Sequence, residues 1–191
     1  MSIVLETSRL SLRQMTHDDL DFLATMLGDP EVMRHYPKCY SRDEARQWLD
    51  KQFGRYAREG HGFWLVIEKQ TQAPVGQVGL LLQNVEGVDE REVGYMLHRP
   101  FWKQGFATEA ARAVRDHAFA NYECPRVISL VRPVNIPSQA VARRMGMSPL
   151  PKTVIYSGYE HFVFAILREQ WVKAEHTTFL SAQSNSGGTL P

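Results

Sequence analysis

The segment from residue 92 to residue 118 constrains the fold of this chain more than any other. It begins with the strand-like stretch EVGYML and continues through RPFWKQ and a single glycine, Gly105, directly into an alanine-rich helix. Small residues then recur at helical spacing on one face of that helix, at Ala110, Ala111, Val114 and Ala118. A helix face made of small side chains lets the helix pack closely against a sheet. The segment therefore predicts a layer of helices on a sheet.

Hydrophobic periodicity predicts further strands and helices along the chain. Strands are expected at residues 5–14, 63–68, 74–83, 92–97 and 127–131, and near Val154 and Phe162; helices are expected at 16–28 and 41–60, from 105 onward, and at 138–145. The helix at 41–60 has the clearest ends, because Ser41 with Glu44 forms a capping-box pattern and Gly60 supplies a stop. This mixture indicates an α/β (α+β) fold.

The length of the chain favours a single domain. At 191 residues, it can bury one sizeable core but is short for two. We expect residues 1–170 to form that domain. The tail at 171–191 contains the Ser- and Gly-rich run SAQSNSGGTLP and is expected to be flexible.

Composition argues against several classes of protein. Lys and Arg total 22 against 21 Asp and Glu, a formal net charge of +1, so no nucleic-acid partner is expected. Cys39 and Cys124 have no paired spacing and the seven histidines no metal-ligand spacing, so no metal is expected. Because the chain shows neither a signal-peptide pattern nor a long apolar run, we expect a cytoplasmic protein without a membrane partner, either monomer or homodimer.

The turn at Gly105 has the physical properties of an anion site. A glycine lets the backbone approach a ligand, and the helix that follows presents free N–H groups and the positive end of its dipole. These properties suit phosphate. A plain strand-to-helix turn would look similar, and the segment matches neither GxGxxG nor a P-loop, since Lys103 precedes the glycine.

A second stretch, residues 131–147, predicts a gap in the sheet. Pro133 removes a backbone donor at a strand end, and Pro137 lies where a helix can begin, so the strand stops pairing before Asn135. The strand ending at Tyr95, Met96 and Leu97 would then keep unpaired backbone groups. An extended ligand containing amides could pair with them.

Taken together, the ordered motifs of residues 5–168 resemble the GCN5-related N-acetyltransferases, and within them the ribosomal-protein N-terminal acetyltransferases. The motifs are ETSRLSLR near the start, DPEVM at 29–33, EVGYML at 92–97, WKQGFATEA at 102–110, and N-x-x-S from 135 followed by RRMGM. The resemblance implies a mixed, mostly antiparallel sheet of about seven strands with splayed central strands, flanked by about four helices. It also implies acetyl-CoA as co-substrate, an amine as acceptor and no metal.

In that family the loop matching residues 102–107 wraps the pyrophosphate of acetyl-CoA, while pantetheine lies between the splayed strands. The residues that the resemblance assigns to acetyl-CoA are Tyr95, Met96, Leu97, Lys103, Gln104, Gly105, Phe106, Ala107, Thr108, Asn135 and Ser138. The acceptor that this resemblance implies first is a protein N-terminal α-amine.

The chain departs from the superfamily pattern at the general acid. The family's usual tyrosine falls at Ala142, which makes Ser138 the candidate for stabilising the leaving thiolate, although Ser138 could equally cap a helix. Glu92 begins the strand whose far end should hold the acetyl group, so it is the candidate base; an ordinary strand-end carboxylate is the alternative. A backbone N–H near Tyr95 to Leu97 could stabilise the oxyanion.

The acceptor remains open at this point. Tyr36, Trp64, Tyr156 and Tyr159 could line its pocket, though core packing is the more frequent role of such aromatics; His98 and His161 are expected to be ordinary surface or core residues. The acidic segment Glu86, Asp89 and Glu90 could attract a cationic acceptor, with a solvated hairpin turn as the simpler interpretation. A small-molecule amine acetyltransferase and a catalytically silent acyl-CoA sensor are the alternative functions.

Overall fold

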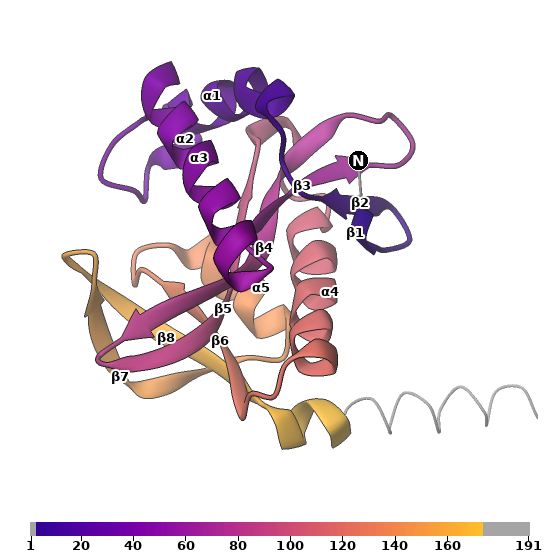
Figure 1. Cartoon of the computed structure of the whole chain (residues 1–191). Coiled ribbons are helices and arrows are strands. Elements are labelled where there is room, and N and C mark those ends of the chain that lie inside the picture. Colours follow the sequence, from indigo (N-terminus) through magenta and orange to yellow (C-terminus); the bar gives the residue numbers. More distant parts are fainter. Residues whose placement is uncertain (1–2, 174–191) are drawn as a thin grey trace, which may run out of the picture.

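The structure, a computed structural model, describes residues 3–173 and is built on one open sheet of eight strands (Figure 1). The strands lie in the order β1-β2-β3-β4-β5-β6-β8-β7. Their bounds are β1 Ile3–Glu6, β2 Leu10–Arg13, β3 Phe63–Glu68, β4 Pro74–Val85, β5 Val88–Leu97, β6 Arg126–Val131, β7 Ser148–Tyr156 and β8 Tyr159–Leu167. All neighbours pair antiparallel except β5 and β6, which run parallel. The mixed, mostly antiparallel sheet confirms the expected fold class.

Helices cover both faces of this sheet (Figure 1). Their bounds are α1 Leu20–Gly28, α2 Pro30–Met33, α3 Arg42–Glu59, α4 Phe106–Asn121 and α5 Ile136–Arg144, with short 3-10 turns at His17–Asp19 and Arg99–Phe101 and a further helix beginning at 168. Core residues of α1 and α3 pack with Leu65, Leu81 and Met96 on one face. The small-residue face of α4 packs on the other face, against Val78, Leu80 and Val93 among others.

The central strands separate where the sequence predicts a gap. β5 and β6 share one register pair, Glu92 with Ile128, and no further pairing toward the C-terminal ends of the two strands. Ser129 bridges them once more, donating its hydroxyl to the Val93 carbonyl at 2.7 Å. Beyond this bridge, the C-terminal part of β5 pairs only with β4 among the strands that the structure describes.

Two local expectations differ from the structure. The single strand expected at 5–14 is a hairpin, β1 and β2, because Thr7 turns the chain by accepting the Leu10 N–H on its hydroxyl at 3.0 Å. The strand expected at 92–97 begins earlier: only Glu86 and Gly87 form the turn after β4, both at positive φ, and β5 begins at the next residue. The hairpin raises the strand count to eight from the expected seven or so.

Other local features are confirmed. α3 carries the expected capping box, with Glu44 accepting the Ser41 N–H at 2.8 Å, and it ends at Gly60 in the left-handed conformation. Within residues 3–173, no helix is long and apolar enough to cross a membrane. Most of the tail that was expected to be flexible, residues 174–191, lies outside the described residues.

Candidate active site

The loop before α4 is shaped so that backbone N–H groups face outward. Lys103 and Gly105 both have positive φ, 61° and 84°, which turns the chain sharply into the helix. No side chain caps the N-terminus of α4. The first N–H groups of the helix, at Phe106, Ala107 and Thr108, therefore remain available to an anion, with the helix dipole behind them.

The hairpin turn between β1 and β2 holds this loop in place. Glu109, in the first turn of α4, accepts hydrogen bonds from the hydroxyls of Thr7 at 2.6 Å and Ser8 at 3.1 Å. It also accepts from the Arg9 backbone N–H at 3.0 Å and from the Arg9 side chain at 2.7 Å. Arg9 in turn donates to the Gln104 carbonyl at 3.0 Å. The motif at the chain start thus acts as a clamp on the anion loop, a role that sequence reasoning did not assign.

The backbone of β5 offers hydrogen bonds toward the gap. N–H and C=O groups of alternate strand residues point to the same side, and the His98 N–H bonds to Val75 on β4 at 2.9 Å. The backbone N–H and C=O groups of Met96 therefore point toward β4. Those of Val93, Tyr95 and Leu97 point toward the gap. The Leu97 carbonyl accepts the Trp102 indole N–H at 2.7 Å. The Tyr95 N–H and C=O and the Leu97 N–H are left for a ligand.

Tyr95 and Ser138 form a hydroxyl pair at the end of this gap. The Tyr95 hydroxyl donates to the Ser138 carbonyl at 2.8 Å, and the Ser138 hydroxyl donates to the Tyr95 oxygen at 3.1 Å. Asn135 caps α5 by accepting the Ser138 N–H at 3.2 Å. Burial raises the pKa of the Tyr95 hydroxyl, so this hydroxyl carries its proton at neutral pH.

These features line one cavity of about 550 Å³. Of the residues assigned to acetyl-CoA from the sequence, ten line it: Tyr95, Met96, Leu97, Lys103, Gly105, Phe106, Ala107, Thr108, Asn135 and Ser138. Gln104 does not, because its side chain donates to the Pro100 carbonyl at 3.0 Å. Arg34 and Arg144 add positive charge beside Lys103. Free N–H groups, flanking cations and an open strand edge fit the pyrophosphate and amides of acetyl-CoA.

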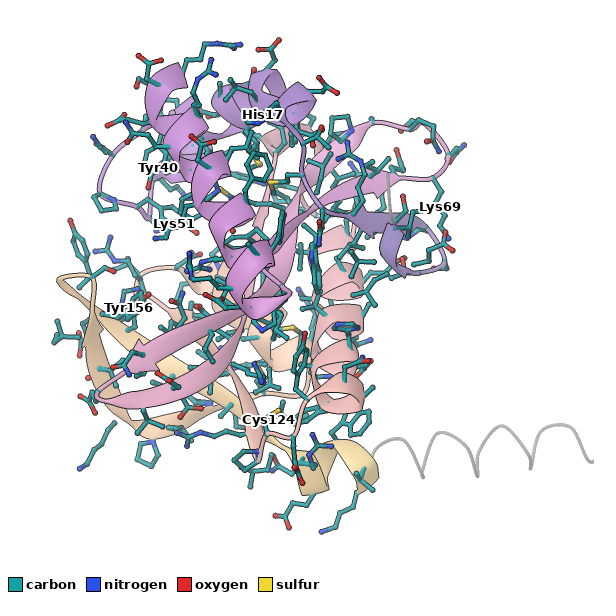
Figure 2. The ribbon with its side chains drawn as sticks, in the orientation of Figure 1. His17, Tyr40, Lys51, Lys69, Cys124 and Tyr156 are labelled. Atoms are coloured by element: carbon teal, nitrogen blue, oxygen red, sulfur yellow. The ribbon has the colours of Figure 1, made fainter. Side chains whose placement is uncertain are left out.

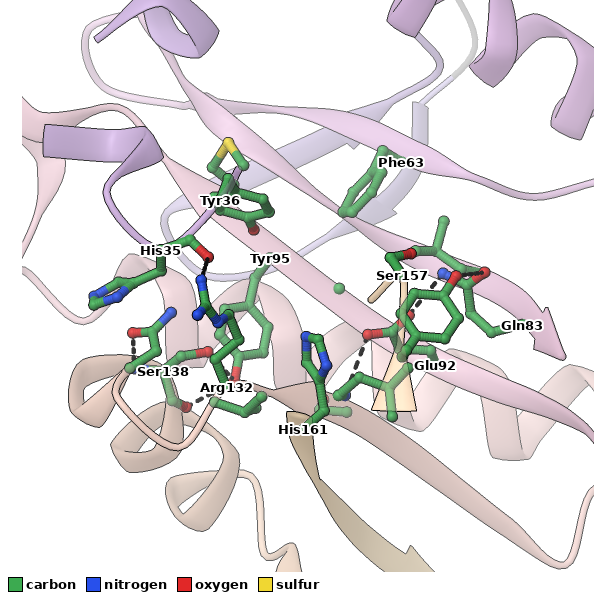
Figure 3. Close-up of a pocket in the computed structure, with 18 of the residues that line it drawn as sticks. His35, Tyr36, Phe63, Gln83, Glu92, Tyr95, Arg132, Ser138, Ser157 and His161 are labelled. Carbon is green, nitrogen blue, oxygen red and sulfur yellow. Dashed lines mark hydrogen bonds between the residues drawn. The ribbon is translucent and has the colours of Figure 1, made fainter. Parts of the chain in front are cut away.

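A second cavity, of about 340 Å³, lies on the other side of the Tyr95–Ser138 pair. The two cavities share the lining residues His35, Tyr36, Tyr95, Met96, Asn135 and Ser138. Figure 3 shows Glu92 and Tyr95 along β5, with Arg132 and His161 close to them. A ligand passing through the first cavity can therefore meet a ligand in the second at Tyr95 and Ser138.

Glu92 is buried in the second cavity, with 8% of its surface exposed. It accepts hydrogen bonds from the Gln83 side chain at 2.9 Å and from the Leu130 N–H at 3.2 Å. Burial raises the pKa of Glu92, while these two hydrogen bonds and then the charge of Arg55 act in the opposite direction and do not cancel it. A carboxylate with a raised pKa is better matched to accept a proton near neutral pH.

Three of the four aromatic residues that the sequence suggested for an acceptor pocket line this cavity. Tyr36, Tyr156 and Tyr159 line it, whereas Trp64 is buried in the core. His161, expected to be an ordinary residue, also lines it; its Nδ1 lies 2.9 Å from the Tyr159 carbonyl, and burial lowers its pKa.

Three further cations line the cavity: Lys51 and Arg55 from α3, and Arg132 from the end of β6. The helical pattern of α3 places polar residues outward but does not reveal which of them face a cavity. Among residues 3–173, no group of three or more His, Cys, Asp or Glu side chains is arranged to hold a metal ion.

The sequence matches a family model described as Acetyltransferase (GNAT) domain over residues 9–148. It is 32% identical over 146 residues to Uncharacterized protein YkkB of Bacillus subtilis, covering 75% of this chain and 84% of that protein.

Solved structures share the fold. The acetyltransferase from Agrobacterium tumefaciens superimposes with a TM-score of 0.75 at 27% identity, covering 87% of this chain and 95% of that one. A putative ribosomal-protein-serine acetyltransferase from Vibrio cholerae superimposes with a TM-score of 0.73 at 25% identity, covering 87% and 99%.

Proposed function

Because the chain belongs to the GNAT acetyltransferase family and is an acetyl-CoA-dependent N-acyltransferase, we propose that it acetylates an α-amine, in the first place a protein N-terminus, by direct attack in a ternary complex. The proposal treats residues 1–170 as one domain, of which the family model covers 9–148.

The observation that carries this proposal is the meeting of two cavities at Tyr95 and Ser138. The first cavity has the backbone donors and cations for acetyl-CoA, and the second holds the buried Glu92. Two substrates can thus be held together, which converts their encounter into a reaction within one complex.

We assign the chemical roles to residues of the chain. When bound, acetyl-CoA supplies an activated acetyl thioester. Glu92 accepts the proton of the attacking amine, directly or through a water molecule. The gap-facing N–H groups of Tyr95 and Leu97 stabilise negative charge on the carbonyl oxygen. The Ser138 and Tyr95 hydroxyls donate to the departing sulfur.

An α-amine suits a single carboxylate base. The pKa of an α-amino group is about 8, whereas that of a lysine side chain is about 10.4, so much more of the α-amine is already neutral at pH 7. The Vibrio cholerae neighbour, by its description a putative ribosomal-protein-serine acetyltransferase, supports a peptide N-terminus as the first acceptor to test.

A small-molecule amine is the second candidate. The acceptor cavity, at about 340 Å³, is of the size that encloses a small ligand. The presence of Glu92 in that cavity supports an enzyme over a silent acyl-CoA sensor.

Thiol release from acetyl-CoA in the presence of two acceptor panels tests the proposal. One panel contains short peptides with free N-termini, and the other contains amino acids, polyamines and aminoglycosides. Faster release with peptides supports N-terminal acetylation, whereas faster release with a small amine supports the alternative. If neither panel caused release of thiol, the remaining candidate would be a catalytically silent acyl-CoA sensor.

A further inference from the structure

The acceptor cavity contains more positive than negative charge. Among its described lining residues, Lys51, Arg55 and Arg132 are cationic, and Glu92 is the single carboxylate. Burial lowers the pKa of both histidines in the lining, His35 and His161, so they add no charge at neutral pH. A ligand in this cavity therefore meets an excess of positive charge.

Arg55 is the most unusual of these cations. It lies in the middle of α3 with 8% of its surface exposed, yet within residues 3–173 its side chain makes no hydrogen bond and no ion pair. Glu92 feels its charge but is not joined to it by an ion pair. Among the described residues, the Arg55 nitrogens do not belong to the buried atoms that lack a partner, so they reach the open space of the cavity, where a ligand can supply hydrogen-bond acceptors.

Lys51 strengthens the same feature. It precedes Arg55 by one helical turn, so both side chains project from the same face of α3. Lys51 also has no ion pair with any residue from 3 to 173. Lys51 on α3 and Tyr156 on β7, both labelled in Figure 2, line the same cavity. Withdrawal from water, and then the charge of Arg55, lower the pKa of Lys51, as expected when no anion lies between them.

Arg132 is held differently. It donates to the His35 carbonyl at 3.0 Å, and its guanidinium lies 4.4 Å from the centre of the Tyr159 ring. These contacts fix the position of Arg132 and use one of its donor groups. Arg132 therefore contributes charge to the cavity while it also holds the lining residues His35 and Tyr159 in place.

Lys51 is an exposed residue whose ammonium lies 6.0 Å from the centre of the Trp48 ring. Among the described cations of this cavity, Lys51 and Arg55 are therefore the two whose side chains have no oxygen partner and can bind an anionic ligand.

We propose that the acceptor is an amine that also carries a carboxylate, which Arg55 and Lys51 bind while Glu92 faces the amine. This inference rests on the proposed acetyl transfer and specifies its substrate class. A guanidinium matches a carboxylate with two parallel hydrogen bonds, and an adjacent ammonium adds attraction. The carboxylate comes either from a free α-amino acid or from an acidic residue near a peptide N-terminus. Polyamines and aminoglycosides are disfavoured because they are repelled by the same cations.

Matched acceptors test the charge requirement. One pair is a free amino acid and its carboxamide; the other is a peptide with aspartate at its second position and its asparagine counterpart. We expect kcat/KM to be at least about tenfold higher for the carboxylate member of one pair. The pair that shows this preference identifies whether the carboxylate comes from a free amino acid or from a peptide. Equal rates within both pairs, or faster turnover of polyamines, would overturn the proposal while leaving acetyl transfer intact.

Substitution on α3 tests the residues. Arg55→Met keeps an unbranched, flexible stem and removes the guanidinium and its charge, and Arg46→Met makes the same change at an exposed position outside the cavity. Arg55→Met should raise KM for the carboxylate acceptor about tenfold, leave KM for acetyl-CoA unchanged and remove the preference within the pair. Lys51→Met should act in the same direction, and Arg46→Met should change nothing. A uniform loss for both pair members would indicate a structural role only.

A binding measurement keeps the test independent of turnover. The acetylated product of the carboxylate acceptor should raise the melting temperature of the wild type more than its carboxamide does. The difference should disappear in Arg55→Met and persist in Arg55→Lys at reduced size. Equal shifts for both products in the wild type would refute the carboxylate site. If products bind with this preference but no acceptor releases thiol, acetyl transfer fails and the anion site stands.

Discussion

Glu92 is the residue on which the proposed chemistry depends most. We expect Glu92→Gln to lower kcat/KM by about a hundredfold near pH 6.5 and by much less at pH 9, where an α-amine is already neutral. The raised pKa of Glu92 adds a second effect, since activity of the wild type falls as pH drops through that pKa. A pH–rate profile of both proteins with one acceptor measures the difference.

The same substitution has a predictable effect on stability. A carboxyl whose pKa is higher in the folded than in the unfolded state favours folding in its protonated form. Its stabilising contribution is present below the unfolded pKa and is lost as pH rises through the folded one. Glu92→Gln should therefore keep or raise the melting temperature at pH 7. A lower melting temperature together with an unchanged pH profile would assign Glu92 to structure.

Tyr95 and Ser138 should behave as one unit. We expect Ser138→Ala and Tyr95→Phe each to lower kcat by about tenfold, and the double variant to lose little more, because the two hydroxyls form a single relay. The losses should shrink with an acetyl donor whose thiol is more acidic, since its leaving group needs less help. If the kcat losses of the two single variants add in the double variant and do not change with the acidity of the donor thiol, the pair only holds α5 against β5.

At the level of elements, a negative charge at the N-terminus of α4 should affect helix stability and phosphate binding in opposite directions. An acidic side chain in the first turn interacts favourably with the helix dipole but repels phosphate. Ala107→Glu should therefore preserve the melting temperature of the free protein and weaken acetyl-CoA binding by at least about tenfold. Ala107→Gln has nearly the same size without the charge. If calorimetry showed that Ala107→Glu and Ala107→Gln weaken acetyl-CoA binding equally, the phosphates would bind elsewhere.

The clamp between the β1–β2 turn and α4 should contribute measurably to stability. Burial alone raises the pKa of Glu109, but hydrogen bonds from Thr7, Arg9 and Ser8 outweigh it and hold that pKa below its usual range. We expect Glu109→Ala to cost about 2 kcal/mol at pH 7. The contribution is present above the unfolded pKa and is lost as pH falls through the folded one, so urea unfolding should show a smaller difference at pH 3. Glu123→Ala, at an exposed position, is the control.

Sequence patterns located the elements that line the cavity proposed for acetyl-CoA better than those that line the cavity proposed for the acceptor. Gly105, the small face of α4 and the prolines after β6 act through local backbone geometry, which short motifs encode. Tyr156 and His161 come from a hairpin that follows the last motif, and Lys51 and Arg55 come from the polar face of a helix. These residues meet through packing of distant segments, which periodicity alone does not specify.

For the molecule as a whole, the open sheet supplies both of the proposed substrate sites. Splaying of β5 from β6 exposes backbone donors on one side, and α3 with β7 and β8 walls the acceptor cavity on the other. Because both cavities reach Tyr95 and Ser138, the acetyl group has no need to rest on a residue of the protein. Direct transfer in a ternary complex is the central claim.

Initial rates of thiol release, measured across a grid of acetyl-CoA and acceptor concentrations, test that claim most directly. Direct transfer predicts double-reciprocal lines that intersect, with thiol released only when the amine is present. Parallel lines, with a burst of thiol and an acetylated protein before the amine is added, would contradict it.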